Sequence, residues 1–155
     1  MKLSEQAEQP SQPPINIQSN ATDARIGIGT SDPLQALHVV GNICYTGSIG
    51  ACSDAAFKKD IEPIDDALAV VDHMTGVKYS WRTEQFPEKK FSSDRQVGLI
   101  AQEVKEVLPE AVTLQNDGYY TIDYSRLTPL LLEAIKELKK QNDDLNKRLE
   151  APENK

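Results

Sequence analysis

The 155-residue sequence has few of the side chains that metal centres and disulfide frameworks use: 2 Cys and 2 His. A structural zinc site takes about four Cys or His ligands, so we expect no metal and no cofactor. Cys44 and Cys52 lie close together in the sequence. They are interpreted as free thiols in a reducing compartment, with a short-loop disulfide as the alternative.

The sequence is also short of positive charge and of long apolar runs. Lys and Arg number 17 against 24 Asp and Glu, the net charge is −7 and the pI is about 4.8. This balance argues against nucleic acid as the main partner, because phosphate binding requires clustered cations. Apolar runs such as residues 130–132 are too short to cross a bilayer, and the start of the chain does not resemble a signal peptide.

The first third of the chain changes composition at about residue 25. Residues 1–24 are rich in Gln, Pro, Ser and Glu and are predicted to be a disordered linker. Residues 25–52 contain short alternating segments at 26–30, 36–40 and 43–46, separated by glycine turns. Strands this short cannot form a stable sheet alone. We therefore predict the β-rich end of a fibre whose core several chains share.

Residues 53–155 have the pattern of a small α+β domain. Helical spacing predicts a helix at 65–74, and alternation predicts a strand at 77–81. A second strand at 96–100 leads into a helix at 101–108. The Asp117-Gly118 pair predicts a hairpin between 111–114 and 119–122.

A long C-terminal helix is predicted for residues 125–150. One stripe along it follows a heptad with a single polar member, Asn142, at spacings of four and three residues: Leu131, Ile135, Leu138, Asn142, Leu145 and Leu149. So narrow a stripe favours a parallel coiled coil, in which a polar member fixes register and chain number. The alternative is that this stripe packs on its own domain.

The strongest chemical candidate is the stretch 52–61, in which Ser53 precedes Lys58 by five positions. A serine hydroxyl needs a base, and a lysine serves only when burial or a neighbouring cation favours its neutral form. Lys59 could be that cation. Taken alone, a serine and a lysine at this spacing are more simply explained as part of a solvated loop.

The sequence resembles the intramolecular chaperone auto-processing domain of phage tailspikes and endosialidases, also found in myelin regulatory factors. Three segments in the same order carry the resemblance: 53–61 with its Ser-Asp, three residues, then Lys; 97–104 with 108–110; and 122–124 with 130–138. Segment 26–43 resembles the strand repeats that precede such domains. Ala55 and Ala56 depart from the family, which often has a basic residue there.

The resemblance implies a homotrimer that assists the folding of an upstream phage tail fibre and then releases itself. In this reading Ser53 is the nucleophile, Lys58 the base and Cys52-Ser53 the scissile bond, cut once in cis. It also implies a virion tail component made in the host cytoplasm, with no nucleic-acid or membrane partner. The alternatives are a trimerisation module that does not cleave and an adhesin tip.

Other polar and aromatic residues are given structural interpretations. Asp54 is expected in a turn or cap, and Gln102 and Glu103 at a helix start, with a role near Ser53 as the less favoured reading. The remaining candidates are expected to be structural or core residues: His38, His73, Tyr79, Trp81 and Tyr120.

Overall fold

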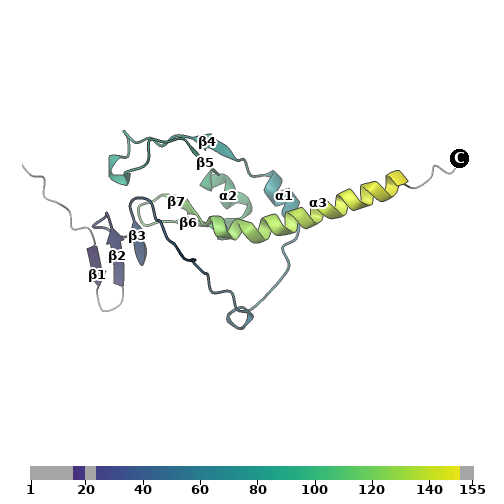
Figure 1. Cartoon of the computed structure of the whole chain (residues 1–155), viewed down its shortest axis with the longest axis horizontal. Helices are drawn as coiled ribbons and strands as arrows, with labels where there is room; N and C mark the ends of the chain where they lie inside the picture. Colours follow the sequence, from purple (N-terminus) through teal and green to yellow (C-terminus); the bar gives the residue numbers. More distant parts are fainter. Residues whose placement is uncertain (1–15, 20–23, 151–155) are drawn as a thin grey trace, which may run out of the picture. The chain divides into compact units, whose positions relative to one another are not determined.

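The computed structural model describes residues 16–19 and 24–150 (Figure 1). The chain divides into two compact units. The first comprises Met1–Ser48 with Trp81–Asp94, and the second comprises Ile49–Ser80 with Arg95–Lys155. The candidate chemistry at Ser53 and the long helix both belong to the second unit.

The first unit contains a three-stranded sheet of β1 (Asn16–Ser19), β2 (Ala24–Ile28) and β3 (Leu37–Val39). β2 is central, antiparallel to β1 and parallel to β3. Gly27 lies in β2 close to the turn that follows this strand. Glycine is required there, because a Cβ would lie 2.5 Å from the Thr30 carbonyl oxygen. Ile26, Ile28 and Leu37 are 40%, 39% and 56% exposed, so these three side chains are only partly buried.

Two predictions for this unit are wrong. Asn16–Ser19, predicted within the disordered linker, form β1, because an antiparallel ladder uses backbone groups and tolerates polar side chains. Residues 43–46, predicted as a strand, are irregular and exposed, and no described strand pairs with them. Ala24, the last residue of the predicted linker, begins β2, and the rest of the linker, 1–15 and 20–23, lies outside the described residues.

The first unit also contains the loop Trp81–Asp94 with η2 (Pro87–Lys89). Trp81, predicted as a core residue, is 37% exposed, and its ring stacks on Phe91 with 4.1 Å between centroids. His38 has the expected structural role, since its Nδ1 accepts a hydrogen bond from the Leu34 N–H at 3.3 Å.

The second unit is a mixture of helices and small sheets, as predicted. It contains η1 (Ala55–Phe57), α1 (Ala67–Asp72), β4 (Val77–Tyr79), β5 (Gln96–Gly98), α2 (Ala101–Val107), η3 (Pro109–Ala111), β6 (Val112–Leu114), β7 (Tyr120–Ile122), η4 (Tyr124–Arg126) and α3 (Leu127–Glu150). β4 pairs with β5, and β6 pairs with β7, in two separate two-stranded antiparallel sheets. The predicted turn at Gly118 is confirmed by its φ of +83°.

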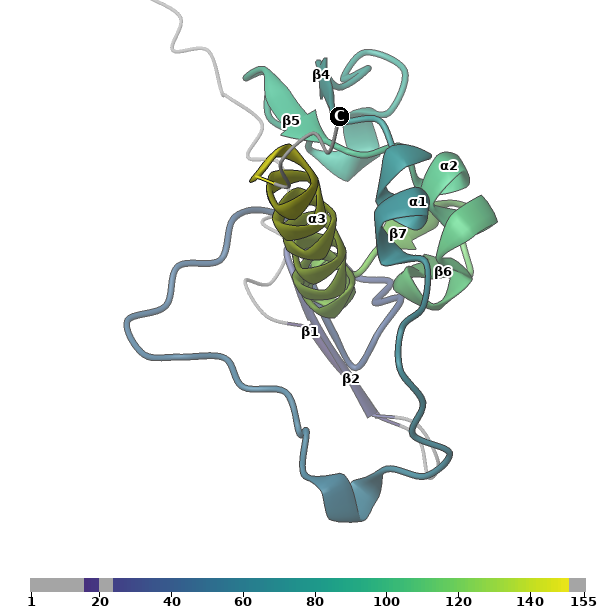
Figure 2. The ribbon, with the colours of Figure 1, turned by 90° about the vertical axis from the view of Figure 1, so that its right-hand side faces the viewer.

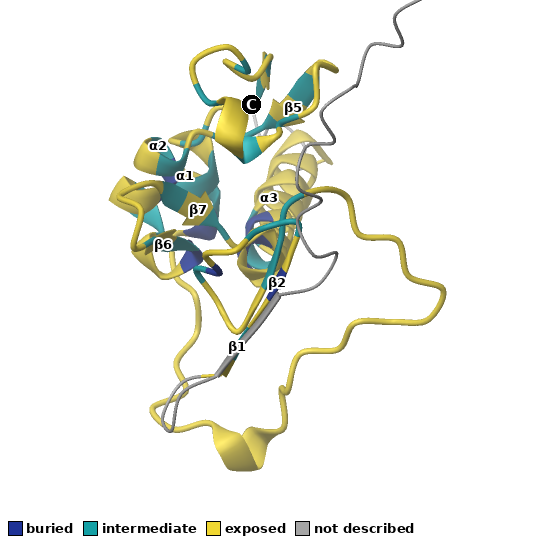
Figure 3. Cartoon of the chain, turned by 90° about the vertical axis from the view of Figure 1, so that its left-hand side faces the viewer, coloured by how far each residue is buried: buried dark blue, intermediate teal, exposed yellow. Residues whose placement is uncertain are grey.

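The core of the second unit is built on the first turns of α3. One cluster joins Ala67 of α1 to Leu130 and Ala134 of α3, and the other joins Val104 and Ala111 to Leu127. In Figure 3 the buried parts of this unit lie on the elements that form these two clusters. Among the described residues, no helix is long and apolar enough to cross a membrane.

The heptad stripe of α3 is exposed over its whole length. Leu131, Ile135, Leu138, Leu145 and Leu149 are 47%, 64%, 54%, 52% and 83% exposed, and Asn142 is exposed as well. The buried stripe of the same helix runs one position earlier, through Leu130 and Ala134. The alternative that the heptad stripe packs on its own domain is therefore wrong, and α3 presents an unpartnered apolar seam.

Candidate active site

Ser53 and Lys58 lie on an exposed arm, residues 49–66, which leads into α1. Figure 2 shows this arm as an extended segment interrupted by one short helical turn, η1. The Asp54 carboxylate accepts a hydrogen bond from the Ala56 N–H at 2.8 Å and caps that turn, which confirms the interpretation of Asp54. In the described structure the hydrogen bonds of residues 49–65 all join near neighbours within the arm.

The turn brings the predicted pair together. The Lys58 N–H donates to the Ala55 carbonyl at 3.0 Å, which closes the turn, and Lys58 Nζ donates to Ser53 Oγ at 2.8 Å. The Lys59 ammonium lies 3.8 Å from the Asp60 carboxylate, and 92% of the Lys59 side chain is exposed. Lys59 is thus solvated as expected.

The Ser53–Lys58 contact has the geometry of a nucleophile beside a base, but in water. Both side chains are exposed to solvent. Apolar side chains before, between and after the two residues are exposed too: Ile49 is 75%, Phe57 78% and Ile61 71% exposed. Cys52 and Cys44 are both exposed free thiols, as predicted.

The other polar candidates lie elsewhere. Glu103 sits in the first turn of α2, where its Oε2 is enclosed and, within the described chain, has no hydrogen-bond partner. No described hydrogen bond joins Gln102 or Glu103 to Ser53 or Lys58. His73 Nδ1 lies 2.8 Å from the Ala69 carbonyl oxygen at the end of α1, a structural contact.

Glu137, which the sequence did not single out, binds the residues at which the arm enters α1. Glu137 of α3 accepts hydrogen bonds from the Ala67 N–H at 2.8 Å through Oε1 and from the Leu68 N–H at 3.0 Å through Oε2. The spacing along the helix could have identified it: Glu137 lies three residues after Ala134, on the same helix face as the buried Leu130 and Ala134. An acid on a buried face calls for donors nearby.

Gly98 and Tyr124, which belong to the segments that carry the family resemblance, lie close together. The Leu99 N–H donates to the Tyr124 hydroxyl at 3.0 Å. A Cβ on Gly98 would lie 2.6 Å from that hydroxyl, so only glycine fits without displacement. Burial raises the pKa of the neighbouring Tyr79, and Tyr124 adds to the rise.

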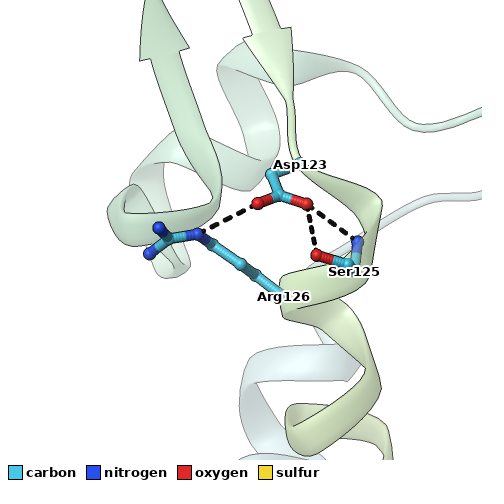
Figure 4. Close-up of polar contacts among 3 residues, drawn as sticks. All are labelled: Asp123, Ser125 and Arg126. Carbon is cyan, nitrogen blue, oxygen red and sulfur yellow. Dashed lines mark hydrogen bonds and ion pairs between the residues drawn. The ribbon is translucent and has the colours of Figure 1, made fainter. Parts of the chain in front are cut away.

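The aspartate of the third resembling segment starts the long helix. Figure 4 shows Asp123 accepting from Ser125 and meeting Arg126; the distances are 2.6 Å from Ser125 Oγ, 3.0 Å from its N–H and 3.2 Å from Arg126 Nε. The Ser125 side-chain hydrogen bond is the main cause that lowers the pKa of the exposed Asp123, with smaller help from Arg126. Asp123 therefore fixes the entry into η4 and α3 while ionised.

Comparison with known proteins defines the class. Residues 53–113 match the family model described as chaperone of endosialidase, a family of the self-cleaving intramolecular chaperone type. This segment belongs to that family, and the resemblance stated from the sequence is confirmed.

The relatives come from phages and from eukaryotes. The chain is 31% identical to the long tail fiber protein Gp37 of Salmonella phage S16 over 118 residues, covering 70% of this chain and 15% of the relative. It is 31% identical to Gp37 of Enterobacteria phage T2 over 101 residues (63% and 7%) and 29% identical to myelin regulatory factor homolog 1 of Caenorhabditis elegans over 135 residues (83% and 14%). The chain thus spans less than a sixth of the length of these relatives.

Proposed function

We propose that this chain is a self-cleaving intramolecular chaperone that trimerises, assists the folding of an upstream tail fibre and then severs the Cys52-Ser53 bond. Residues 25–52 are the end of the fibre, residues 53–155 are the chaperone, and the cleaved chaperone leaves the virion tail. The phage fibre relatives support the client, since both are named long tail fiber proteins. We place synthesis and assembly in the bacterial host cytoplasm.

One observation carries the catalytic part of the proposal: Lys58 Nζ lies 2.8 Å from Ser53 Oγ. That distance is within reach for proton transfer between a nucleophile and its base. The matching family segment also begins at residue 53, the residue that would follow the cut.

The reaction balances with one water molecule. A neutral Lys58 amine takes the Ser53 Oγ proton while Oγ attacks the Cys52 carbonyl carbon. When the C–N bond breaks, the Ser53 nitrogen receives that proton and an ester joins Cys52 to Ser53 Oγ. Water hydrolyses the ester to a carboxyl group on Cys52 and a hydroxyl on Ser53, and the carboxyl proton passes to the new Ser53 amine, which leaves a carboxylate and an ammonium group. The attack needs no substrate binding, because nucleophile and carbonyl belong to adjacent residues.

Assembly supplies what the single chain lacks. The exposed seam of α3 matches the heptad of a parallel coiled coil, with Asn142 as the polar member that fixes register, and we assign it to a homotrimer. Enclosing the arm in the assembled trimer removes the water around Lys58 and favours its neutral amine. Cleavage then follows correct assembly.

The test is a time course of the purified chain on denaturing gels, with oligomeric state followed in parallel. The wild type is expected to yield fragments 1–52 and 53–155, with Ser53 as the new N-terminus by mass spectrometry. Ser53→Ala should remain a full-length trimer. Lys58→Arg, which keeps the charge but cannot act as the base, should cleave at least about a hundredfold more slowly.

Lys59→Arg is the matched control and should cleave at the wild-type rate, because Lys59 is solvated. A trimeric wild type that stays at full length would favour the non-cleaving trimerisation module or adhesin tip. A new N-terminus at any residue other than Ser53 would refute the assigned bond.

A further inference from the structure

The N-terminus of α1 has no cap from its own segment. Asp66 occupies the N-cap position with φ 51° and ψ 31°, and its side chain makes no capping hydrogen bond. No acidic residue lies in the first turn of the helix. The first N–H groups of a helix lack partners within the helix, and leaving them buried without one is costly.

Glu137 of α3, about 70 positions later in the sequence, supplies the missing hydrogen-bond acceptor. Its two carboxylate oxygens each accept one of the first two N–H groups of α1, at 2.8 and 3.0 Å. A carboxylate at a helix N-terminus is also favoured by the helix dipole, and charge-assisted hydrogen bonds of this kind are strong. Ala67, one of the two donors, is fully buried against Leu130 and Ala134.

The same turns of α3 present both the anchor and the seam. Ala134 and Glu137 face α1, whereas Ile135 and Leu138, each one position later, belong to the exposed heptad stripe and are 64% and 54% exposed. Any partner helix seated on the seam would therefore fix the turn from which Glu137 reaches α1.

We propose that Glu137 is a positioning residue that ties the arm bearing Ser53 and Lys58 to the assembling helix. The inference rests on the proposed function and deepens it. The arm has no described hydrogen bonds to the rest of the unit before residue 66, so the place where α1 docks is its nearest fixed point. Glu137 fixes that point against the helix that forms the trimer.

The tether length sets a lower limit for the effect. With α1 docked, 14 positions separate Ser53 from Ala67; with α1 released, the next ordered element is β4 at Val77, 24 positions away. Because the effective concentration of the arm at the trimer surface that encloses it falls roughly as the −3/2 power of tether length, the longer tether alone lowers that concentration about twofold. Without Glu137 the arm also loses its fixed orientation, which slows cleavage further. We expect cleavage to be about tenfold slower in total.

The experiment compares cleavage rates of the full chain as wild type, Glu137→Gln and Glu137→Ala, with the trimer fraction and amide exchange measured on each. Gln keeps one acceptor oxygen, so its rate should lie between the other two. The Ala67 and Leu68 amides should exchange about tenfold faster in Glu137→Ala, while the trimer fraction stays at the wild-type level. Glu133→Gln, which loses an equal charge one turn earlier where Glu133 pairs with Lys136, should behave as wild type.

A stability control separates positioning from simple destabilisation. Val112→Ala, in β6 on the other core cluster, loosens the fold without touching α1 and should leave cleavage unchanged. The proposal is overturned if Glu137→Ala cleaves within twofold of wild type, if its trimer disappears in step with cleavage, or if Val112→Ala slows cleavage equally at a matched loss of stability. A wild type that never cleaves overturns the proposed function, and this inference with it, whereas amide exchange still reports separately whether Glu137 caps α1.

Discussion

Two leucines on α3 allow a direct test of the seam. Leu130 is 1% exposed in the single chain and Leu138, two turns later, is 54% exposed. Leu130→Ala should lower the free energy of unfolding by about 2–5 kcal/mol, because it leaves a cavity in the core. Leu138→Ala should change it by less than about 0.5 kcal/mol in the single chain.

For association of the proposed trimer the order reverses, because Leu138 belongs to the exposed heptad stripe and Leu130 to the core of the single chain. Burying a leucine fully is worth about 1.5–3 kcal/mol, and roughly half of Leu138 remains to be covered, so each chain loses about 1 kcal/mol of association free energy. Three chains lose about 3 kcal/mol, a weakening of about a hundredfold. Sedimentation equilibrium in the Ser53→Ala background, with urea unfolding at several chain concentrations, measures both effects. Unchanged association of Leu138→Ala, or a loss of single-chain stability equal to that of Leu130→Ala, would refute the assignment of the seam.

Two further predictions concern the residues that hold β5 and the start of α3. Gly98→Ala should destabilise the fold by about 1–3 kcal/mol, since its Cβ would lie 2.6 Å from the Tyr124 hydroxyl; adding Tyr124→Phe should recover part of this loss in urea unfolding. The pKa of Asp123 is lower in the folded than in the unfolded chain, so its stabilising contribution is complete above the unfolded pKa and is lost as pH falls through the folded one. Asp123→Asn should flatten that acid limb of the urea midpoint, which lies below about pH 5, and an unchanged slope there would contradict the role of Asp123.

Elements with strong local patterns were predictable, and elements that depend on a distant partner were not. The Asp117-Gly118 turn fixed its hairpin because Gly118 supplies the positive φ of +83°. Asn16–Ser19 were predicted to be disordered because the segment 1–24 is rich in Gln, Pro, Ser and Glu, yet β2 provides backbone partners that composition cannot reveal. Residues 43–46 have strand character but, within the described chain, no strand to pair with.

The candidate site divides in the same way. Ser53 and Lys58 were singled out by spacing and by family resemblance, and a local turn is enough to bring them within 2.8 Å. Glu137 was missed because its partners, the N–H groups of Leu68 and Ala67, lie 69 and 70 positions away in the sequence. The left-handed backbone at Asp66, whose side chain makes no capping hydrogen bond, was not predictable from the sequence either.

The local origin of the Ser53–Lys58 contact bears on how assembly could control cleavage. Asp54 and η1 set the contact inside a single exposed arm, so trimerisation is not needed to bring the two atoms together. What the single chain lacks is a dry environment, because the arm and its apolar side chains Phe57 and Ile61 are exposed. On the proposed function, assembly therefore acts by enclosing and placing the arm, and not by bringing Lys58 to Ser53. A chain that has not assembled would then hold the pair in contact without cleaving, and cleavage would report that the trimer has formed.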